Sequence, residues 1–154
     1  MQVRELCTRA VVTCWRDTTA LAMACLMRDH HVGAVIVVDE GDGGVTPVGI
    51  VTDRDLVIHV MAKGVAPELL RAGDLAREEE LVTVLESELV YDAIWHMRGK
   101  GIRRLPVVDR KSHLVGVVTS DDLTRFLAEE LSAVTRAVPR QIKLEESRRA
   151  PAAT

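Results

Sequence analysis

The sequence contains few aromatic residues and no long apolar run, and both shortages exclude classes of protein. Aromatic residues make up 3% of the 154 residues, so the chain lacks the set of stacking side chains that binds single-stranded nucleic acid or sugars. Its longest apolar segments, residues 20–27 and 32–38, are well short of the ~18 residues of a membrane span. The sequence therefore predicts a protein that neither crosses a membrane nor binds nucleic acid by base stacking.

Cysteine is also scarce, and the charges nearly balance. Cys7, Cys14 and Cys25 are odd in number and show no Cys-x-x-Cys spacing, which argues against a disulfide framework or a zinc knuckle. No ligand spacing joins them to His30 and His31 as a metal site. The formal charge is −3, with 20 basic against 23 acidic residues, so no basic field attracts DNA, RNA or anionic lipid. Charged residues at the N-terminus, where a signal peptide needs an apolar stretch, indicate a cytosolic protein.

What the sequence does contain is an internal repeat. The hydrophobic fraction of 47% supports a buried core. One short signature occurs twice, as PVGIVTDRDL at residues 47–56 and as LVGVVTSDDL at residues 114–123. Each copy has a glycine, an apolar run, a threonine, two further residues, an aspartate and a leucine. A repeat of this kind fixes the architecture, since each copy is too small to bury a core alone.

Matching elements surround both copies of the signature. A short β-branched segment comes first, then a helix with apolar residues at i, i+3, i+4 and i+7, a strand, a turn, a second strand and a last helix. In the first copy these elements are expected at residues 11–13, 20–27, 34–39, 40–47, 48–52 and 56–61. In the second copy they are expected at residues 81–84, 90–97, 105–109, 110–113, 115–119 and 123–131. Asp17 and Ser87 are the expected N-caps of the two long helices.

The spacing between the copies indicates one fold. Asp39 corresponds to Asp109 at an offset of 70, and Gly49 to Gly116 at an offset of 67. The first copy therefore has three extra residues, which we place in its turn, where insertions are tolerated. Strands joined by a tight turn pair antiparallel. The expected fold is α+β, with two β-α-β-β-α repeats packed sheet to sheet into one pseudo-twofold module.

The chain divides accordingly into four segments. Residues 1–63 are the first domain with an N-terminal helix, and residues 64–80 are a linker with its own short helix. Residues 81–132 are the second domain. Residues 133–154 are a helical extension, and after Pro139 the chain becomes a polar tail that we expect to be mobile.

The linker is expected to pack on the body of the module. Pro67 suits the first turn of its helix, and Leu69, Leu70 and Leu75 provide an apolar face. Residues 3–8 resemble the linker helix in composition, so we expect them to form the same element ahead of the first repeat.

The Thr-x-x-Asp part of each signature has two chemical interpretations. At the start of a helix it forms a capping box, in which the threonine accepts from a backbone N–H and the aspartate reaches back. The same carboxylate can instead accept from the two vicinal hydroxyls of a ribose, with a phosphate beside the helix N-terminus. The residues alone leave both roles open, and the two are compatible because a ligand can displace the cap.

The repeat as a whole resembles a tandem pair of CBS (cystathionine beta-synthase) domains, called a Bateman module. The signature Gly-h-h-Thr-x-x-Asp, where h is apolar, occurs at residues 49–55 and 116–122, inside copies that align from residue 1 to about 132. The spare layout is similar to small stand-alone bacterial CBS proteins. The resemblance implies a non-catalytic sensor that binds adenosine-type ligands (AMP, ADP, ATP, S-adenosylmethionine or NAD) in the clefts between its domains. It also implies dimerisation into a disk and signalling to a downstream protein.

The resemblance assigns binding residues, and the two copies differ among them. Ribose or phosphate contacts are expected from Thr52, Arg54, Asp55, Arg103, Arg104, Thr119, Asp121 and Asp122. The adenine pocket is expected from Val12, Val32, Ile50, Val82, Ile102 and Val117. Arg103 and Arg104 of the second copy correspond to Gly33 and Ala34 of the first. We therefore expect two clefts of unequal charge, with the better nucleotide site at Asp55, which Arg103 of the other copy faces.

Three other functions are alternatives. A ligand-free scaffold that acts through protein interaction would have the same fold. An enzyme would need a nucleophile beside a base, a P-loop or a His-Glu-x-x-His motif, and the sequence has none of these, so no catalytic residue and no metal site is expected. Nucleic-acid binding conflicts with the net negative charge. We expect a homodimer, because half a disk exposes apolar helix surface.

Overall fold

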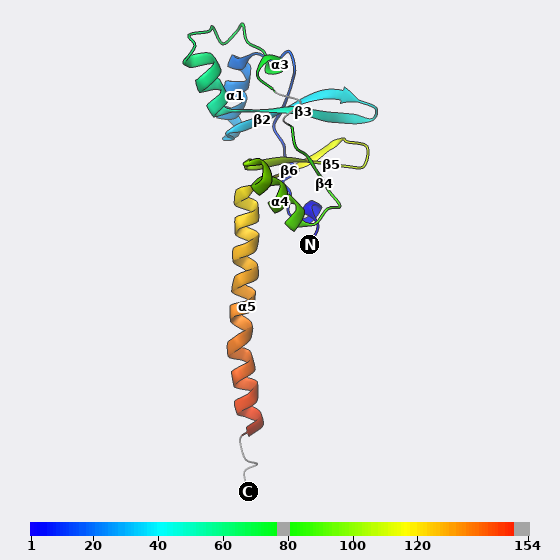
Figure 1. The fold of residues 1–154 in the computed structure, drawn as a ribbon, viewed down its shortest axis with the longest axis vertical. Coiled ribbons are helices and arrows are strands. Elements are labelled where there is room, and N and C mark those ends of the chain that lie inside the picture. Colours follow the sequence, from blue (N-terminus) through cyan, green and yellow to red (C-terminus); the bar gives the residue numbers. More distant parts are fainter. Residues whose placement is uncertain (77–80, 150–154) are drawn as a thin grey trace.

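The computed structural model describes residues 1–76 and 81–149, and side chains as far as residue 136. Each repeat forms a three-stranded sheet (Figure 1). The first sheet consists of β1 (Thr13–Trp15), β2 (Ala34–Gly41) and β3 (Gly44–Thr52). The second consists of β4 (Val84–Leu85), β5 (Arg104–Val108) and β6 (Leu114–Thr119). In both sheets the first strand is parallel to the second and the second is antiparallel to the third.

A helix connects the first two strands of each sheet, and another follows the third. The connecting helices are α1 (Ala20–His30) and α4 (Val90–Lys100). In the first repeat the last helix is α2 (Asp53–Leu56), which continues as a π-helical turn, η2 (Val57–Met61). In the second repeat it is α5 (Ser120–Arg149). The predicted order β-α-β-β-α is confirmed in both copies.

The connecting helices begin at Ala20 and Val90, as the sequence predicts, but their N-caps differ from those expected. Thr19, and not Asp17, is the N-cap of α1, because its hydroxyl accepts from the Ala22 amide at 3.2 Å. Likewise the N-cap of α4 is Leu89 and not Ser87. The first strand of each repeat starts two or three residues later than expected, so the turn before each helix is shorter than the sequence predicts.

The three extra residues of the first repeat lengthen its hairpin and not its loop. β2 and β3 stay paired as far as Gly41 and Gly44, so the turn expected over residues 40–47 is reduced to Asp42 and Gly43. Gly43 has a φ of 86°, a conformation that glycine adopts without strain in a tight hairpin turn. Both hairpins shift register at the corresponding place, as expected for two copies of one fold.

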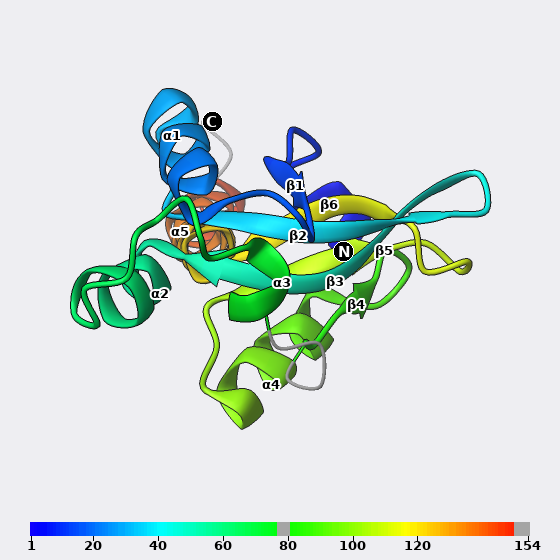
Figure 2. The same cartoon turned by 90° about the horizontal axis from the view of Figure 1, so that it is seen from above.

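The two sheets pack against each other as one module. β3 contacts β6, and Figure 2 shows β2 and β3 lying over β5 and β6. Each repeat keeps its own core, which includes Met23 and Val35 in the first repeat and Val90 and Leu105 in the second. The predicted α+β module of two repeats packed sheet to sheet is confirmed.

The segment that precedes each repeat packs with the other repeat. The short N-terminal helix η1 (Val3–Glu5) places Val3 in the core of the second repeat. In the same way α3 (Ala72–Leu75), just before the second repeat, places Ala72 in the core of the first. The two segments are equivalent elements, as expected, but the N-terminal helix belongs in space to the second domain and not to the first.

The linker forms less helix than the sequence predicts. Its helix is limited to α3, and Pro67 lies in a turn ahead of it. Leu70 and Leu75 pack against the core of the first repeat, whereas Leu69 is 75% exposed. The prediction that Leu69 also packs is wrong, because the turn around it lacks the helical periodicity that would place all three leucines on one face. Residues 77–80 of the linker lie outside the described residues.

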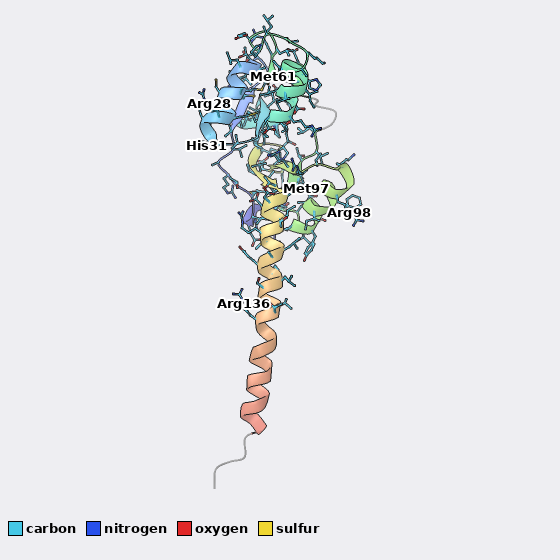
Figure 3. The ribbon with its side chains drawn as sticks, turned by 90° about the vertical axis from the view of Figure 1, so that its left-hand side faces the viewer. Arg28, His31, Met61, Met97, Arg98 and Arg136 are labelled. Carbon is cyan, nitrogen blue, oxygen red and sulfur yellow. The ribbon has the colours of Figure 1, made fainter. Side chains whose placement is uncertain are left out.

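The last helix joins the helix expected over residues 123–131 and the expected helical extension after residue 133 into one element. α5 is 30 residues long and projects beyond both sheets (Figure 1), and Arg136 lies on the projecting part (Figure 3). The chain stays helical through Pro139 to Arg149, where the sequence predicts a mobile tail, and residues 150–154 lie outside the described part. None of the described helices is both long and apolar enough to cross a membrane.

Candidate ligand-binding site

Two cavities lie between the repeats, and each takes residues from both. Cavity A has a volume of about 500 Å³ and is lined by the signature of the first repeat and by residues 101–104 of the second. Cavity B has a volume of about 390 Å³ and is lined by the signature of the second repeat and by residues 31–34 of the first. Both volumes are in the range of small-ligand sites. The two cavities are related by the pseudo-twofold arrangement of the repeats.

Every residue expected to bind ligand lines one of these cavities. Cavity A is lined by Ile50, Thr52, Arg54, Asp55, Val82, Ile102, Arg103 and Arg104. Cavity B is lined by Val12, Val32, Val117, Thr119, Asp121 and Asp122, and also by Ile50 and Arg104. The structure therefore brings together each predicted adenine wall with one predicted Thr-x-x-Asp signature. It also places Arg103 in the cavity of Asp55, as expected from the sequence.

Each signature forms the capping box that the sequence suggests. At α2 the Thr52 amide and hydroxyl donate to Asp55 Oδ2 at 2.8 and 2.6 Å, and the Asp55 amide donates to Thr52 Oγ1 at 3.3 Å. At α5 Thr119 and Asp122 make the same three contacts at 3.0, 2.7 and 3.2 Å. Each cap uses only the Oδ2 atom of its aspartate. The cap thus fixes the carboxylate at the wall of its cavity and leaves Oδ1 for another partner.

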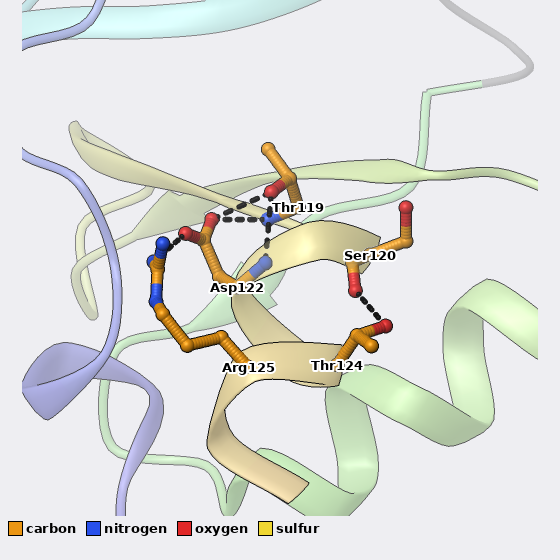
Figure 4. Close-up of polar contacts among 5 residues, drawn as sticks. All are labelled: Thr119, Ser120, Asp122, Thr124 and Arg125. Carbon is orange, nitrogen blue, oxygen red and sulfur yellow. Dashed lines mark hydrogen bonds and ion pairs between the residues drawn. The ribbon is translucent and has the colours of Figure 1, made fainter. Parts of the chain in front are cut away.

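The Oδ1 atom distinguishes the two copies. Asp122 Oδ1 accepts from Arg125 Nη2 at 2.6 Å (Figure 4). Among residues 1–76 and 81–136, no group donates to Asp55 Oδ1. The position that corresponds to Arg125 in the first repeat, at the offset of 67, is the apolar Ile58. A ligand therefore finds a free acceptor at Asp55, whereas at Asp122 it has to displace an ion pair.

The cavities also differ in charge. Counting the described residues, cavity A has three arginines against two aspartates, and cavity B has one arginine against two aspartates. With arginine charged and the carboxyl groups ionised, the formal charge is +1 in cavity A and −1 in cavity B. None of these arginines forms an ion pair with a side chain of the described residues. The charged residues are Asp53, Arg54, Asp55, Arg103 and Arg104 in cavity A and Arg104, Asp121 and Asp122 in cavity B.

Arg104 lies at the wall that separates the two cavities. A Cβ atom on Gly33 would be 3.3 Å from Nη2 of Arg104 and 3.2 Å from Oδ2 of Asp53. The glycine therefore leaves the space that the guanidinium and the carboxylate fill. Arg104 corresponds to Ala34 in the first repeat, so the module has one arginine at this wall and not two.

Sequence reasoning missed some lining residues. Cavity A also contains Asp53 and His59, and cavity B also contains Thr8 and His31. His31 ends α1 in the left-handed conformation, with a φ of 54°, at the end of the helix nearest the second repeat (Figure 3). Asp53 and His31 could have been found, because they are immediate neighbours of predicted residues. Thr8 could not, because its contribution depends on the N-terminal segment crossing to the other repeat.

The donor set of both cavities suits binding by hydrogen bonds and charge. Carboxylates, threonine hydroxyls and arginines face an apolar wall of valine and isoleucine. Within the described part of the chain, no three or more His, Cys, Asp or Glu side chains form a group that could hold a metal ion.

These features define a tandem-repeat module with two cavities between its repeats. Residues 3–62 and 72–129 each match the CBS domain. The chain belongs to the CBS domain family, as the resemblance of its two signatures indicated. Both matched regions include the segment that crosses to the other repeat.

Two relatives show how far the similarity extends. An uncharacterised protein of Methanopyrus kandleri is 41% identical over 80% of this chain, which spans 61% of that protein's length. Hypoxic response protein 1 of Mycobacterium tuberculosis is 32% identical over 82% of this chain and 85% of its own.

Two solved structures share the fold of this chain. A crystal structure of hypoxic response protein I with two coordinated zinc ions has a TM-score of 0.71, at 30% identity, over 81% of this chain and 98% of its own. A CBS domain protein from Pyrobaculum aerophilum complexed with AMP has a TM-score of 0.74, at 27% identity, over 86% of this chain and 99% of its own. The shared region covers both repeats.

Proposed function

We propose that this protein is a non-catalytic regulatory module that binds adenosine-type ligands, foremost AMP, ADP or ATP, between its two CBS domains. Cavity A is the main nucleotide site. The observation that carries this proposal is the grouping, in one cavity, of three arginines, an apolar wall and an aspartate whose Oδ1 accepts from none of the described residues. The AMP complex of the Pyrobaculum protein supports the ligand class, because that protein aligns with this chain across both repeats.

Each part of an adenine nucleotide has a partner in cavity A. Asp55 Oδ1 accepts from the ribose hydroxyls, as the acidic residue of dinucleotide-binding folds does. Arg54 and Arg103 bind the phosphate through charge-assisted hydrogen bonds. Ile50 and Ile102, from different repeats, form the two sides of an apolar slot for adenine.

Binding at this place is suited to signalling. Because cavity A takes residues from both repeats, an occupied cavity stabilises one arrangement of the two sheets relative to the other arrangements. A ligand shifts such an equilibrium by its difference in affinity for the states. A downstream protein that contacts the helices of both repeats would then respond to the ligand.

Calorimetric titration of AMP, ADP, ATP, S-adenosylmethionine and NAD tests the proposal. We expect Asp55→Ala to weaken AMP binding at least about 10-fold, because a hydrogen bond to a charged group contributes about 1.5–3 kcal/mol. Asp122→Ala should have a much smaller effect on this main site. Equal losses in the two variants would contradict the assignment of cavity A.

Asp92→Ala is the matched control. Asp92 Oδ2 accepts from the Leu89 amide at 2.9 Å, which caps α4 much as Asp55 caps α2, but Asp92 lines neither cavity. This variant loses a cap without losing a ligand contact, so its AMP affinity should equal that of the wild type.

The alternative is a ligand-free scaffold. It is favoured by Tyr91 and Trp95, which expose 66% and 72% of their surface on α4 and suit a protein contact. A thermal-shift screen separates the two functions, since a ligand at 100 times its Kd adds about 2.7 kcal/mol to the stability. No shift with any adenosyl compound would favour the scaffold. In either case we propose a cytosolic homodimer.

A further inference from the structure

The two cavities differ at corresponding positions, and some of these differences change a charge. At the offset of 67, Arg54 in cavity A corresponds to Asp121 in cavity B. At the offset of 70, Arg103 in cavity A corresponds to Gly33 in cavity B. Since the repeats have the same fold, these residues occupy equivalent places beside the two signatures. The cavities therefore offer the same hydrogen-bonding frame with opposite formal charge.

The pair Arg54 and Asp121 makes the largest difference. Each is the second residue of the helix that begins after the threonine of its signature. Each is exposed, and each lines its own cavity. Neither side chain forms an ion pair with the described residues. A phosphate in cavity A meets an unpaired guanidinium at this position, whereas a phosphate in cavity B would meet a second carboxylate next to Asp122.

Cavity B lacks a counterpart of Arg103, because Gly33 lies at the corresponding position. The space beside Gly33 is filled by the guanidinium of Arg104 and the carboxylate of Asp53. Arg104 also lines cavity A, so a phosphate bound there competes for it. Cavity B therefore has no arginine of its own, and Arg125 already binds the Oδ1 atom of Asp122.

We propose that the cavities take different classes of adenosyl ligand. Cavity A takes a phosphate-bearing nucleotide, and cavity B takes an adenosyl compound without phosphate, with Arg54 and Asp121 as the residues that determine this specificity. The inference rests on the proposed function, since it presumes that adenosyl compounds bind. It gives the module a response to two different ligands.

AMP and adenosine form the matched pair of probes, because they differ only by the phosphate. In calorimetry with the wild-type protein, we expect AMP to bind tightly at one site per chain. Adenosine added to the AMP-saturated protein should then bind at one further site. Tight binding of AMP at two equivalent sites per chain would overturn the inference.

Charge exchange provides the second test. Asp121→Arg should create a second AMP site by strengthening AMP binding in cavity B roughly 10- to 100-fold, and Arg54→Asp should weaken AMP binding in cavity A by a similar factor. Adenosine binding should change less than 3-fold in both variants. Both residues are exposed at the start of a helix, so the variants should fold, which circular dichroism checks.

A control separates charge from size. Arg54→Gln keeps most of the side-chain length without the charge and should weaken AMP binding, by less than Arg54→Asp does. The AMP preference of cavity A should also fall with rising salt, since exposed charges are screened. Unchanged AMP affinity in Arg54→Asp and Asp121→Arg would overturn the specificity assignment while leaving the proposed function intact. If neither AMP nor adenosine binds to the wild type, the proposed function itself fails.

Discussion

At the scale of single residues, the aspartate of each signature serves the helix and the cavity with different oxygens. Oδ2 closes the capping box in both copies. Oδ1 is held by Arg125 in Asp122, and no described residue donates to it in Asp55. The cap and the ribose contact, which the sequence presents as alternatives, can therefore exist together on one carboxylate. Ile58 and Arg125, one helical turn further on, decide in which copy Oδ1 is left without a donor among the described residues.

The glycine of each signature is required by the close approach of a crossing segment. A Cβ on Gly49 would lie 2.4 Å from the Cβ of Ala76, and one on Gly116 would lie 2.9 Å from Sγ of Cys7. We expect Gly49→Ala to lower the free energy of unfolding by about 1–3 kcal/mol, because the linker has to move away from β3. Urea denaturation measures the change.

Gly99 provides the matched control for this substitution. It lies inside α4, and an added Cβ would meet nothing within 4 Å. Gly99→Ala should raise the free energy of unfolding by up to about 1 kcal/mol, because alanine favours a helix interior. Equal effects of the two glycine substitutions would show that the approach of Ala76 does not constrain the signature.

The Cys14 thiol should be alkylated slowly at neutral pH. Burial raises the pKa of the Cys14 thiol to about 11 from 9.0, and only the thiolate is alkylated. At pH 8 we expect iodoacetamide to react with Cys14 on the order of 100-fold more slowly in the native protein than in urea, as followed by mass spectrometry. Similar rates in the two states would contradict this environment.

The same shift has a consequence for stability. The native state holds the Cys14 proton more tightly than the unfolded state, so the contribution of this thiol to stability is fully present below pH 9. It is lost as the pH rises from about 9 towards 11. Cys14→Ala should therefore show a smaller fall in the free energy of unfolding over this range than the wild type does.

At the scale of elements, periodicity predicted the strands and helices, and contacts between segments decided their ends. The apolar spacing of α1 and α4 is intrinsic to the sequence, and Met23 and Met27 are indeed buried. The N-caps were misplaced, because several polar residues precede α1 and only the structure shows that the Thr19 hydroxyl accepts from the Ala22 amide. The prediction that Leu69 packs on the core was wrong, because the linker helix α3 starts only at Ala72 and does not include Leu69.

The crossing of the connecting segments leads to a prediction for Val3. Its side chain is 0% exposed in the core of the second repeat. We expect Val3→Ala to lower the free energy of unfolding by about 2 kcal/mol, because it leaves a cavity there. Native-state hydrogen exchange should speed up in α4 and β5 before it does in α1 and β2.

Val57→Ala is the control for this change. Val57 is 51% exposed on η2, so the same truncation should change the stability by less than about 0.5 kcal/mol. If Val3→Ala instead increased hydrogen exchange first in α1 and β2, the N-terminal helix would stabilise the first repeat and not the second.

At the scale of the whole molecule, the resemblance to CBS domains provided the expected binding residues, and the offsets between the repeats showed where the two copies differ. The structure places the expected residues around two cavities, each lined by both repeats. The difference between the cavities could be foreseen at Arg103, whose counterpart is Gly33. The shared place of Arg104 could not, because it follows from distances across the interface between the repeats. The Arg125 contact is local, at i+3 from Asp122 on α5, so the helical spacing could have indicated it.

Exposed apolar side chains on the outer helices, α4 and α5, predict that the chain forms a dimer. Trp95 and Tyr91 lie one turn apart on α4, which contacts α5, and Leu131 on α5 is 66% exposed. Exposed aromatic residues of this kind are typical of interface hot spots. We expect a homodimer in sedimentation velocity at micromolar concentration, and we expect Trp95→Glu to raise the dimer Kd by about 30-fold or more, since a hot-spot residue contributes at least about 2 kcal/mol.

Trp15 provides the control for the dimer contact. It is also half-exposed, but it lies on β1 and away from the outer helices, so Trp15→Glu should sediment as the wild type does. Dilution of a Trp15→Phe variant would follow Trp95 alone, whose fluorescence should shift to longer wavelength as the dimer dissociates. The prediction fails if the wild type is a monomer at micromolar concentration, or if Trp15→Glu and Trp95→Glu have equal effects. Either result would show that this helical face does not bind a second copy of the chain.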